Sequence, residues 1–335
     1  MMKPLPWCPR ITPGTEGGSE ASQGALEKRR NVFSGERAPL ITELHKNLST
    51  PGKMEKEPFD VIEQVLDGNM VQHGPMNDRI YLMKTAPESE ENLPQKLIEM
   101  AEKHGYSKIF AKIPSTHCDQ FLQLGYRVEA IIPGFYNGKE AGCFLGYYLD
   151  KSRAEETDRI FCEKCHILAL EKKETSHELP EPSLKLRKCE EKDVEEMAAI
   201  YQQVFKTYPF PIFDPAYLLQ AMRKDVVFFG AESHGEMVAL SSAEIDYKSA
   251  SVEMTDFATL PSWRGKGLAA YLLAVMERFC QAEELKTAYT IARAVSPAIN
   301  ITFSRSGYQW CGRLKNNTQI SGCIESMNVW YKKLS

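Results

Sequence analysis

The sequence predicts an α/β protein (of the α+β type) whose largest part is built on a mixed central sheet. Between residues 184 and 335, short apolar runs with strand-like alternation are interleaved with segments whose apolar residues recur at helical spacing. The apolar run 251–259 is followed by a glycine-rich turn and then by the amphipathic segment 268–279. These two observations predict a strand, a tight turn and a helix in direct succession.

The other elements of this region are expected in the order β-α-β-β-β-loop-α-β-α-β-β. Asp193 is expected to cap the first helix, with Glu196 completing a capping box three residues later. Gly307 is expected to end the last helix. Strands are expected at 184–187, 226–230, 237–240, 251–259, 287–292, 310–314 and 325–331, and helices at 194–205, 268–279 and 297–305.

The turn after residue 259 has the composition of a phosphate-binding loop. Glycine permits positive φ and lets a phosphate approach the backbone, while the N-terminus of a helix offers free N–H groups and a favourable dipole. The segment Arg264-Gly-Lys-Gly267-Leu-Ala269 lacks the spacing of the dinucleotide fingerprint and of the P-loop. The alternative is a glycine turn that only opens an ordinary helix.

Arg264-x-x-Gly267-x-Ala269 resembles the pyrophosphate loop, R/Q-x-x-G-x-G/A, of the GNAT acyl-CoA N-acyltransferases. The order of elements around the loop resembles the whole GNAT fold, and the segment 303–308 resembles the family's x-x-x-G-[FY] signature. The resemblance implies acetyl-CoA as co-substrate and no metal. It implies cofactor contacts from Arg264, Gly265, Lys266, Gly267, Leu268 and Ala269, from the backbone of Ala258, Thr259 and Leu260, and from Asn300.

Acetyl transfer to an alkylamine benefits from a general base, because an amine of pKa about 10.4 is almost wholly protonated at pH 7. Glu253 stands eleven positions before Arg264, a spacing at which many GNAT enzymes place a catalytic glutamate. Many GNAT enzymes also carry a tyrosine as general acid where this chain has Phe303. A phenyl ring cannot donate a proton, so Ser304 or a water is the alternative donor.

The acceptor is predicted from a second resemblance, which spans residues 58–333. The strand 77–83, the loop 133–138 and the C-terminal GNAT unit together resemble the β-lysine N6-acetyltransferases. This implies acetylation of the terminal amine of (S)-β-lysine, giving a zwitterion suited to osmoadaptation as a compatible solute. Acids expected to bind the acceptor's ammonium are Glu244, Asp256 and Asp246, and cations expected to bind its carboxylate are Arg79, Arg223 and Lys248.

Two alternatives stay open for the function. One is acetylation of another small amine, such as a polyamine or lysine. The other is a non-catalytic regulator that binds acetyl-CoA, which Phe303 suggests. The acids near Glu253 could also be solvated strand ends.

The N-terminal part contains an echo of the C-terminal part. The strand 108–113 and the helix ending at Gly125 are followed by two strands, and a shift of 182 residues superposes Gly125 on Gly307 and Tyr148 on Trp330. We therefore expect a smaller, degenerate GNAT-like domain that lacks the pyrophosphate loop. The expected organisation is a disordered extension at 1–53, this domain at 54–150, a charged linker at 151–182 and the catalytic GNAT domain at 183–335. A further hypothesis is that Met54 is the natural start.

The composition limits partners and location. A net charge of −4 argues against a nucleic-acid partner, and no apolar run approaches the length of a membrane span. The nine scattered cysteines and the lack of an apolar signal region indicate a cytoplasmic protein. Cys162-x-x-Cys165-His166 matches a haem-attachment pattern, but we interpret it as two ordinary cysteines on a helix at 160–170. The oligomeric state is not predicted.

Overall fold

The computed structural model describes residues 59–65, 68–86, 92–172 and 184–334. Lys53–Ser335 form one compact unit, and within its described part thirteen strands make a single mixed sheet. The expected extension at 1–53 and the proposed start at Met54 lie outside the described residues. The predicted α/β class with a mixed sheet is confirmed.

We call β1–β6 and their helices the N-terminal half, and β7–β13 and theirs the C-terminal half. The N-terminal half comprises β1 (Val61–Val65), β2 (Asn69–Gly74), β3 (Arg79–Lys84), α3 (Leu93–His104), β4 (Lys108–Pro114), η1 (Ser115–His117), α4 (Cys118–Gln123), β5 (Arg127–Tyr136) and β6 (Glu140–Tyr148). The connection contains η2 (Lys151–Ala154) and α5 (Arg159–Glu171). The C-terminal half comprises β7 (Lys185–Lys188), η3 (Glu191–Asp193), α6 (Val194–Val204), α7 (Pro215–Met222), β8 (Val226–Ser233), β9 (Glu236–Asp246), β10 (Ser251–Thr259), η4 (Pro261–Trp263), α8 (Leu268–Ala282), β11 (Thr287–Arg293), α9 (Pro297–Arg305), β12 (Gln309–Ile320) and β13 (Cys323–Lys333).

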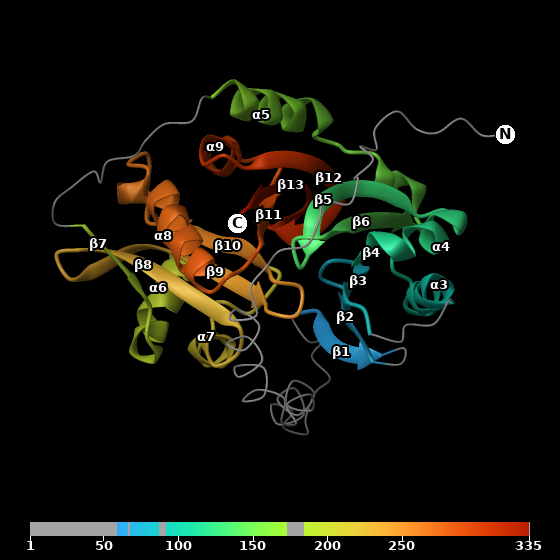
Figure 1. The fold of residues 1–335 in the computed structure, drawn as a ribbon, viewed down its shortest axis with the longest axis horizontal. Coiled ribbons are helices and arrows are strands. Elements are labelled where there is room, and N and C mark those ends of the chain that lie inside the picture. Colours follow the sequence, from blue (N-terminus) through green and yellow to red (C-terminus); the bar gives the residue numbers. More distant parts are fainter. Residues whose placement is uncertain (1–58, 66–67, 87–91, 173–183, 335) are drawn as a thin grey trace, which may run out of the picture. The chain divides into compact units, whose positions relative to one another are not determined.

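The two halves repeat one topology, as the echo in the sequence predicts. The strand order is β1-β2-β3-β4-β6-β5-β12-β13-β11-β10-β9-β8-β7 (Figure 1). In each half a parallel pair, β3–β4 or β10–β11, is connected through a helix, α3 or α8. Gly125 and Gly307 both adopt positive φ just beyond α4 and α9. Both halves therefore arrange their strands in the same order around a parallel pair.

The half-sheets join where β5 meets β12. The pairing there is between Ala130 and Gly312. Gly312 has a φ of +149°, and a Cβ atom on it would lie 2.0 Å from the carbonyl oxygen of Glu129, so this close approach requires glycine. Beside the junction, the buried ammonium of Lys108 donates to Glu129 (2.9 Å) and to the carbonyl of Lys315 (2.6 Å). Lys108 and Glu129 thus pair within the N-terminal half, and both also hydrogen-bond Lys315 of β12 across the junction.

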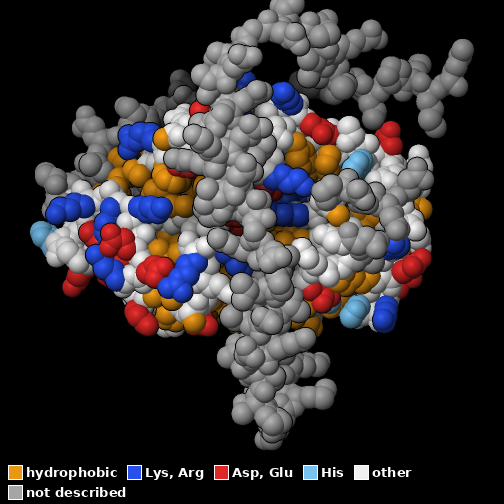
Figure 2. Space-filling view, turned by 60° about the horizontal axis from the view of Figure 1, so that its bottom comes forward, with side chains coloured by type: hydrophobic (Ala, Val, Ile, Leu, Met, Phe, Trp, Pro, Cys, Tyr) orange, Lys and Arg blue, Asp and Glu red, His pale blue; other side chains and the backbone are white. Residues whose placement is uncertain are grey.

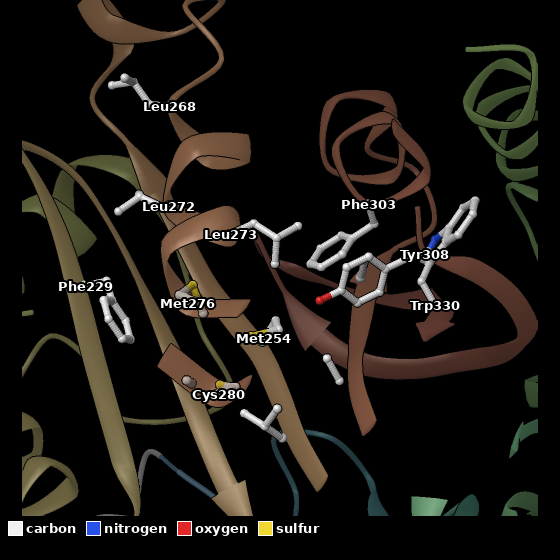
Figure 3. Packing of buried hydrophobic residues seen from close by; sticks show 14 of the residues in the cluster. Phe229, Met254, Leu268, Leu272, Leu273, Met276, Cys280, Phe303, Tyr308 and Trp330 are labelled. Carbon is white, nitrogen blue, oxygen red and sulfur yellow. The ribbon is translucent and has the colours of Figure 1, made fainter. Parts of the chain in front are cut away.

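Helices cover both faces of the C-terminal half-sheet. Ser241 of β9 donates to the sulfur of Met276 in α8 (3.0 Å), whereas the next residue, Ser242, donates to Asp256 (2.6 Å) on the other face. Figure 3 shows the α8 side, where the apolar side chains of α8 pack toward Phe229 and Met254 of the sheet. The opposite face carries α6, α7 and a second apolar cluster.

The sheet is curved so that one face of each half meets the other. Tyr289 of β11 packs against Phe135 of β5, with ring centres 5.1 Å apart, and the ammonium of Lys112 in β4 lies 3.3 Å from the Tyr289 hydroxyl. Four strands separate β4 from β11 in the sheet order. These contacts are possible only because the sheet bends back on itself, which places a shared core between the halves.

Two local predictions for the C-terminal half need correction. Asp193 is the N-cap residue of α6, but its carboxylate accepts from the Glu190 N–H (2.7 Å) and from Arg187 rather than from the first turn of α6. Glu196 accepts from the N–H of Met237 (2.7 Å), so the predicted Asp193–Glu196 capping box is wrong. Arg187 binds the Asp193 carboxylate and the Met237 N–H binds that of Glu196, so neither carboxylate caps the first turn of α6. The sequence analysis also missed α7.

The connecting helix α5 forms where a helix was expected. It buries Cys162 and Cys165, consistent with ordinary core cysteines. None of the helices in the described ranges is long and apolar enough to cross a membrane. On the face that Figure 2 shows, side chains of both charge signs occur together.

Candidate active site

The glycine-rich loop is exposed and opens α8 in the predicted way. Gly265 and Gly267 have φ of +79° and +78°, and Gly267 is the N-cap residue of α8. Leu268 is buried and anchors the first turn in the core, while the backbone before it faces solvent. The ammonium of Lys266 lies 3.9 Å from the Trp263 ring centre, so it stays over the loop. The loop thus offers positive charge and exposed N–H groups together.

Strands β10 and β11 separate close to Glu253. Their parallel register covers only Ser251–Thr287, Val252–Ala288 and Glu253–Tyr289, although β10 continues to Thr259. An irregularity between Thr255 and Ala258 accompanies the separation, and Asp256 there has a φ of +56°. The edge of β10 that faces β11 is therefore open beyond Glu253.

Ala258, Thr259 and Leu260 were predicted to bind the cofactor arm through their backbone, but they do not all face the open edge. The N–H of Leu260 donates to the carbonyl of Val238 on β9 (3.0 Å). Successive strand residues direct their backbone groups to opposite edges, so those of Thr259 face the gap, and those of Ala258 and Leu260 face β9.

Asn300 does not face the gap. It is fully buried, and its amide donates to the carbonyls of Arg293 (2.9 Å) and Ser296 (2.7 Å). Its oxygen accepts from Asn328 and from Trp330, both at 2.9 Å. The side chain thus uses its full hydrogen-bonding capacity within the protein, tying α9 to β11 and β13. This geometry disagrees with the expected contact to the cofactor.

Three carboxyl groups lie together beside the point where the strands separate; we call Glu244, Glu253 and Asp256 the carboxylate cluster. Glu253 and Glu244 are direct cross-strand partners on β10 and β9, so their side chains share a face of the sheet. Asp256 accepts hydrogen bonds from Ser242 (2.6 Å) and from the Tyr208 hydroxyl on that same face. In the described part of the chain, no group of three or more His, Cys, Asp or Glu residues has an arrangement that would hold a metal ion.

Burial shifts the cluster toward the neutral acid form. Burial raises the pKa of Glu253, and the charge of Lys112 and a hydrogen bond from Tyr289 partly oppose that rise. Burial raises the pKa of Glu244 well above its usual value, and the neighbouring Glu253 charge adds to the effect. Burial also raises the pKa of Asp256, against hydrogen bonds from Ser242 and Tyr208. Carboxyl groups of raised pKa are suited to proton transfer near neutral pH.

The N-terminal half contributes cations and aromatic rings to this region. Lys112 of β4 is half-buried, and its ammonium lies between the rings of Tyr81, Phe135 and Tyr289. Sequence reasoning missed Lys112. The signal available was a lysine in the middle of an apolar strand, between Ala111 and Ile113. Side chains of both halves therefore meet in this region.

Three cations were predicted to bind the acceptor's carboxylate. Of these, Arg79 lies in the core between the halves. It is 4% exposed, and its guanidinium donates to the carbonyl of Asn317, to Thr318 (3.3 Å) and to Gln72 (3.4 Å). Its Nε is buried without a hydrogen-bond partner. Burial lowers the pKa of Arg79 to about 10. A buried guanidinium with an unused donor is well suited to bind an anion.

The other two cations are on the surface. Arg223 pairs with Glu191 (2.8 Å), and Lys248 is exposed in the turn between β9 and β10. Asp246 pairs with Lys84 (3.4 Å) at the edge of the same region. Neither Arg223 nor Lys248 makes a contact with the carboxylate cluster among the described residues.

Phe303 is a core residue. It is fully buried and packs edge-on against Phe257 and Tyr308, with ring centres 5.6 and 4.9 Å apart (Figure 3 shows Phe303 and Tyr308). The aromatic ring thus fills a space in the core beside α8.

Comparisons with known proteins identify the family to which the chain belongs. The model of the acetyltransferase (GNAT) family matches residues 194–308. The β-lysine N(6)-acetyltransferase of Methanococcus maripaludis is 36% identical over 275 residues, which cover 81% of this chain and 99% of that protein. The β-lysine N(6)-acetyltransferase of Methanosarcina mazei is 35% identical over 262 residues, covering 71% and 95%. The N-acetyltransferase YodP of Bacillus subtilis is 33% identical over 270 residues, covering 79% and 96%.

These relatives span both halves and not the GNAT region alone. A short motif match could arise by chance, but identity above 30% across two structurally repeated units does not. The chain is an N-acetyltransferase of the GNAT superfamily and belongs to the family of the β-lysine N6-acetyltransferases.

Proposed function

We propose that this protein transfers the acetyl group of acetyl-CoA to the N6 amine of (S)-β-lysine in the cytoplasm. The observation that carries the proposal is the presence of a carboxylate cluster in one half and of a buried, partly unsatisfied guanidinium in the other. Gln72 connects the two sides, since it contacts Arg79 (3.4 Å) and the carbonyl of Pro209 (3.5 Å). The neighbouring Tyr208 hydrogen-bonds Asp256. An acceptor with ammonium groups and one carboxylate matches these charges.

Acetyl-CoA would bind at the loop and along the open edge of β10. The pyrophosphate would lie against the loop from Arg264 to Ala269, where exposed N–H groups and two exposed cations favour phosphate. The pantetheine arm would pair with the backbone of Thr259 in the gap. This arrangement brings the thioester toward Glu253, where the strands part.

Glu253 would act as the general base. It removes one proton from the N6 ammonium, directly or through a water, and the freed nitrogen lone pair attacks the thioester carbonyl. The C–N bond forms while an electron pair moves to oxygen, where a backbone N–H in the gap would stabilise it. The C–S bond then breaks, the sulfur keeps the electron pair, and the nitrogen loses a second proton. One proton remains with the CoA thiol, and one is released overall.

The rest of the cluster would recognise the acceptor. Glu244 and Asp256 would accept hydrogen bonds from an ammonium of β-lysine. Arg79 would bind the carboxylate through its unused Nε and a neighbouring Nη donor, the fork that guanidinium presents to carboxylates. The product carries one ammonium and one carboxylate, as expected of a compatible solute.

The alternatives fit these observations less well. A polyamine has no carboxylate and would leave the Arg79 Nε buried and unsatisfied. A non-catalytic regulator would need the loop but not a base of raised pKa beside the gap.

The test is release of the CoA thiol from acetyl-CoA, with β-lysine, α-lysine and spermidine compared under identical conditions. We expect turnover on β-lysine to exceed that on the other two amines, and the product's NMR spectrum to place the acetyl group on N6. Acetyl-CoA binding without turnover on any of the three would overturn the proposal in favour of a regulator. Preferred turnover on spermidine would overturn the assigned acceptor.

A further inference from the structure

The positions of Glu244 and Glu253 alone do not decide which of them is the general base. They are direct cross-strand partners, both are half-buried, and each is the like-charged neighbour of the other. Two such carboxyl groups do not both ionise readily, so one keeps its proton. The general base must be the one that loses it. A group outside the pair must therefore favour ionisation of one carboxyl group over the other.

Lys112 supplies a positive charge beside the pair. Its ammonium is enclosed by three rings, with centres 5.8 Å away for Tyr81 and 5.7 Å for both Phe135 and Tyr289. Burial opposes the charged form of Lys112, but its neighbours Tyr81 and Glu253 raise its pKa, and the aromatic faces also favour a cation. The charge of Lys112 favours ionisation of both Glu253 and Glu244, whereas a hydrogen bond from Tyr289 favours ionisation of Glu253.

Tyr289 connects the lysine to the base. Its hydroxyl lies 3.3 Å from the Lys112 ammonium, and it hydrogen-bonds Glu253, its direct partner in the β10–β11 register. Glu244 stands on β9, one strand further from Tyr289. A tyrosine that accepts from an ammonium is a better donor to a carboxylate. The chain Lys112–Tyr289–Glu253 therefore favours the charged form of Glu253 over that of Glu244.

We infer that Lys112, acting through Tyr289, is a positioning residue that keeps Glu253 as the carboxylate and leaves the proton on Glu244. The inference rests on the proposed role of Glu253 as base. Because Lys112 belongs to β4, the half without a pyrophosphate loop supplies a group on which the chemistry depends. Truncation to the GNAT region alone would lose that group.

Other charged and titratable groups face the same site and are part of the balance. Around Glu253, Glu244 and Lys112, these groups are Asp256, Asp246, Lys84, Tyr81, Tyr208, Tyr217 and Tyr136. Asp256 opposes ionisation of Glu253, and Lys84 pairs with Asp246 rather than with Glu253. Lys112 is thus the cation placed to act on the base.

The experiment measures the Glu253 titration in the full chain. Carboxyl-labelled glutamate gives a carbon NMR signal for Glu253, identified by its disappearance in Glu253→Gln. We expect Lys112→Met to raise the midpoint by one pH unit or more, a tenfold change in the protonation equilibrium. Lys112→Arg should restore it to within a few tenths of a unit, and Tyr289→Phe should raise it by less than Lys112→Met. The acid limb of the kcat/KM profile should shift with these midpoints.

Lys139→Met, in the exposed turn after β5, is the matched control and should leave the midpoint unchanged. An unchanged midpoint in Lys112→Met would overturn the inference even if activity fell, because a merely structural lysine lowers the rate without moving the titration. Should Lys112→Met not fold, an unchanged midpoint in Tyr289→Phe would overturn it equally. A shifted midpoint in a protein that does not acetylate β-lysine would instead contradict the proposed function and leave the inference standing.

Discussion

Tyr289 lies directly opposite Glu253 on β11 and β10, and the register between these parallel strands ends at this pair. Two structural features therefore meet at this pair. On one side of the pair the strands hold each other, and on the other they open a gap with a free backbone edge. The base thus stands at the end of the gap, facing a lysine from the other half of the molecule.

Gly267→Ala tests whether the loop conformation matters for the cofactor. Gly267 has a φ of +78°, where a side chain costs about 1–2 kcal/mol, although there is space for a methyl group. We expect the dissociation constant for acetyl-CoA, measured by calorimetry, to rise about 5–30-fold. Gly235→Ala, at φ +86° in the β8–β9 turn, carries similar strain far along the chain from the loop. If both variants bind acetyl-CoA like the wild type, the loop does not hold the cofactor.

Gly312→Ala tests the junction of the halves. The new Cβ would lie 2.0 Å from the Glu129 carbonyl oxygen, so β5 and β12 must move apart. We expect a loss of unfolding free energy on the order of 3 kcal/mol, measured by urea denaturation. Gly322→Ala, at φ +95° with open space around it, should cost only its backbone strain. Equal losses in the two variants would mean that the junction adds no stability.

Arg79→Lys tests recognition of the acceptor's carboxylate. Lysine keeps the charge but loses the planar fork of donors. We expect KM for β-lysine to rise about tenfold or more, and kinetics with an acceptor lacking the carboxylate to stay as in the wild type. Arg223→Lys, on an exposed ion pair, is the control and should change neither. A parallel loss with both acceptors would assign Arg79 a purely structural role.

Glu244→Gln tests whether the Glu244 carboxyl group is protonated in the folded protein. Burial raises the folded-state pKa of Glu244, whereas an unfolded glutamate has a pKa near 4.3. The wild type therefore loses stability as the pH rises above about 4.3, because only the unfolded chain releases the proton freely. Glutamine carries no such penalty, so the variant's gain in unfolding free energy should grow between pH 5 and pH 9. Glu195→Gln, exposed on α6, should show no such trend.

The sequence predicted the C-terminal half best. Its strands and helices follow from apolar periodicity, and the loop glycines at 265 and 267 follow from their need for positive φ. The capping box at Asp193 failed because Arg187, which is near Asp193 only in the folded sheet, binds that carboxylate. Helix α7 was missed because its eight residues contribute few buried side chains to a periodic pattern.

The site itself was only partly predictable. Glu253 and Arg79 lie on strands that the sequence predicts, whereas Glu244 lies beyond the predicted strand 237–240 because β9 extends to Asp246. Lys112 could not be assigned, since its contact with Tyr289 depends on the curvature of a sheet in which four strands separate β4 from β11. The side-chain partners of Asn300, Asn328 and Trp330, come from a later strand and could not be assigned from the sequence either.

The most direct test of the whole account is the rate of CoA-thiol release with β-lysine for the wild type and Glu253→Gln. Glutamine preserves the shape of the side chain but cannot take a proton. We expect kcat/KM to fall about 10²–10⁴-fold while the affinity for acetyl-CoA stays that of the wild type. A variant that acetylates β-lysine at the wild-type rate would contradict the role of Glu253 and, with it, the placement of the site between the two halves.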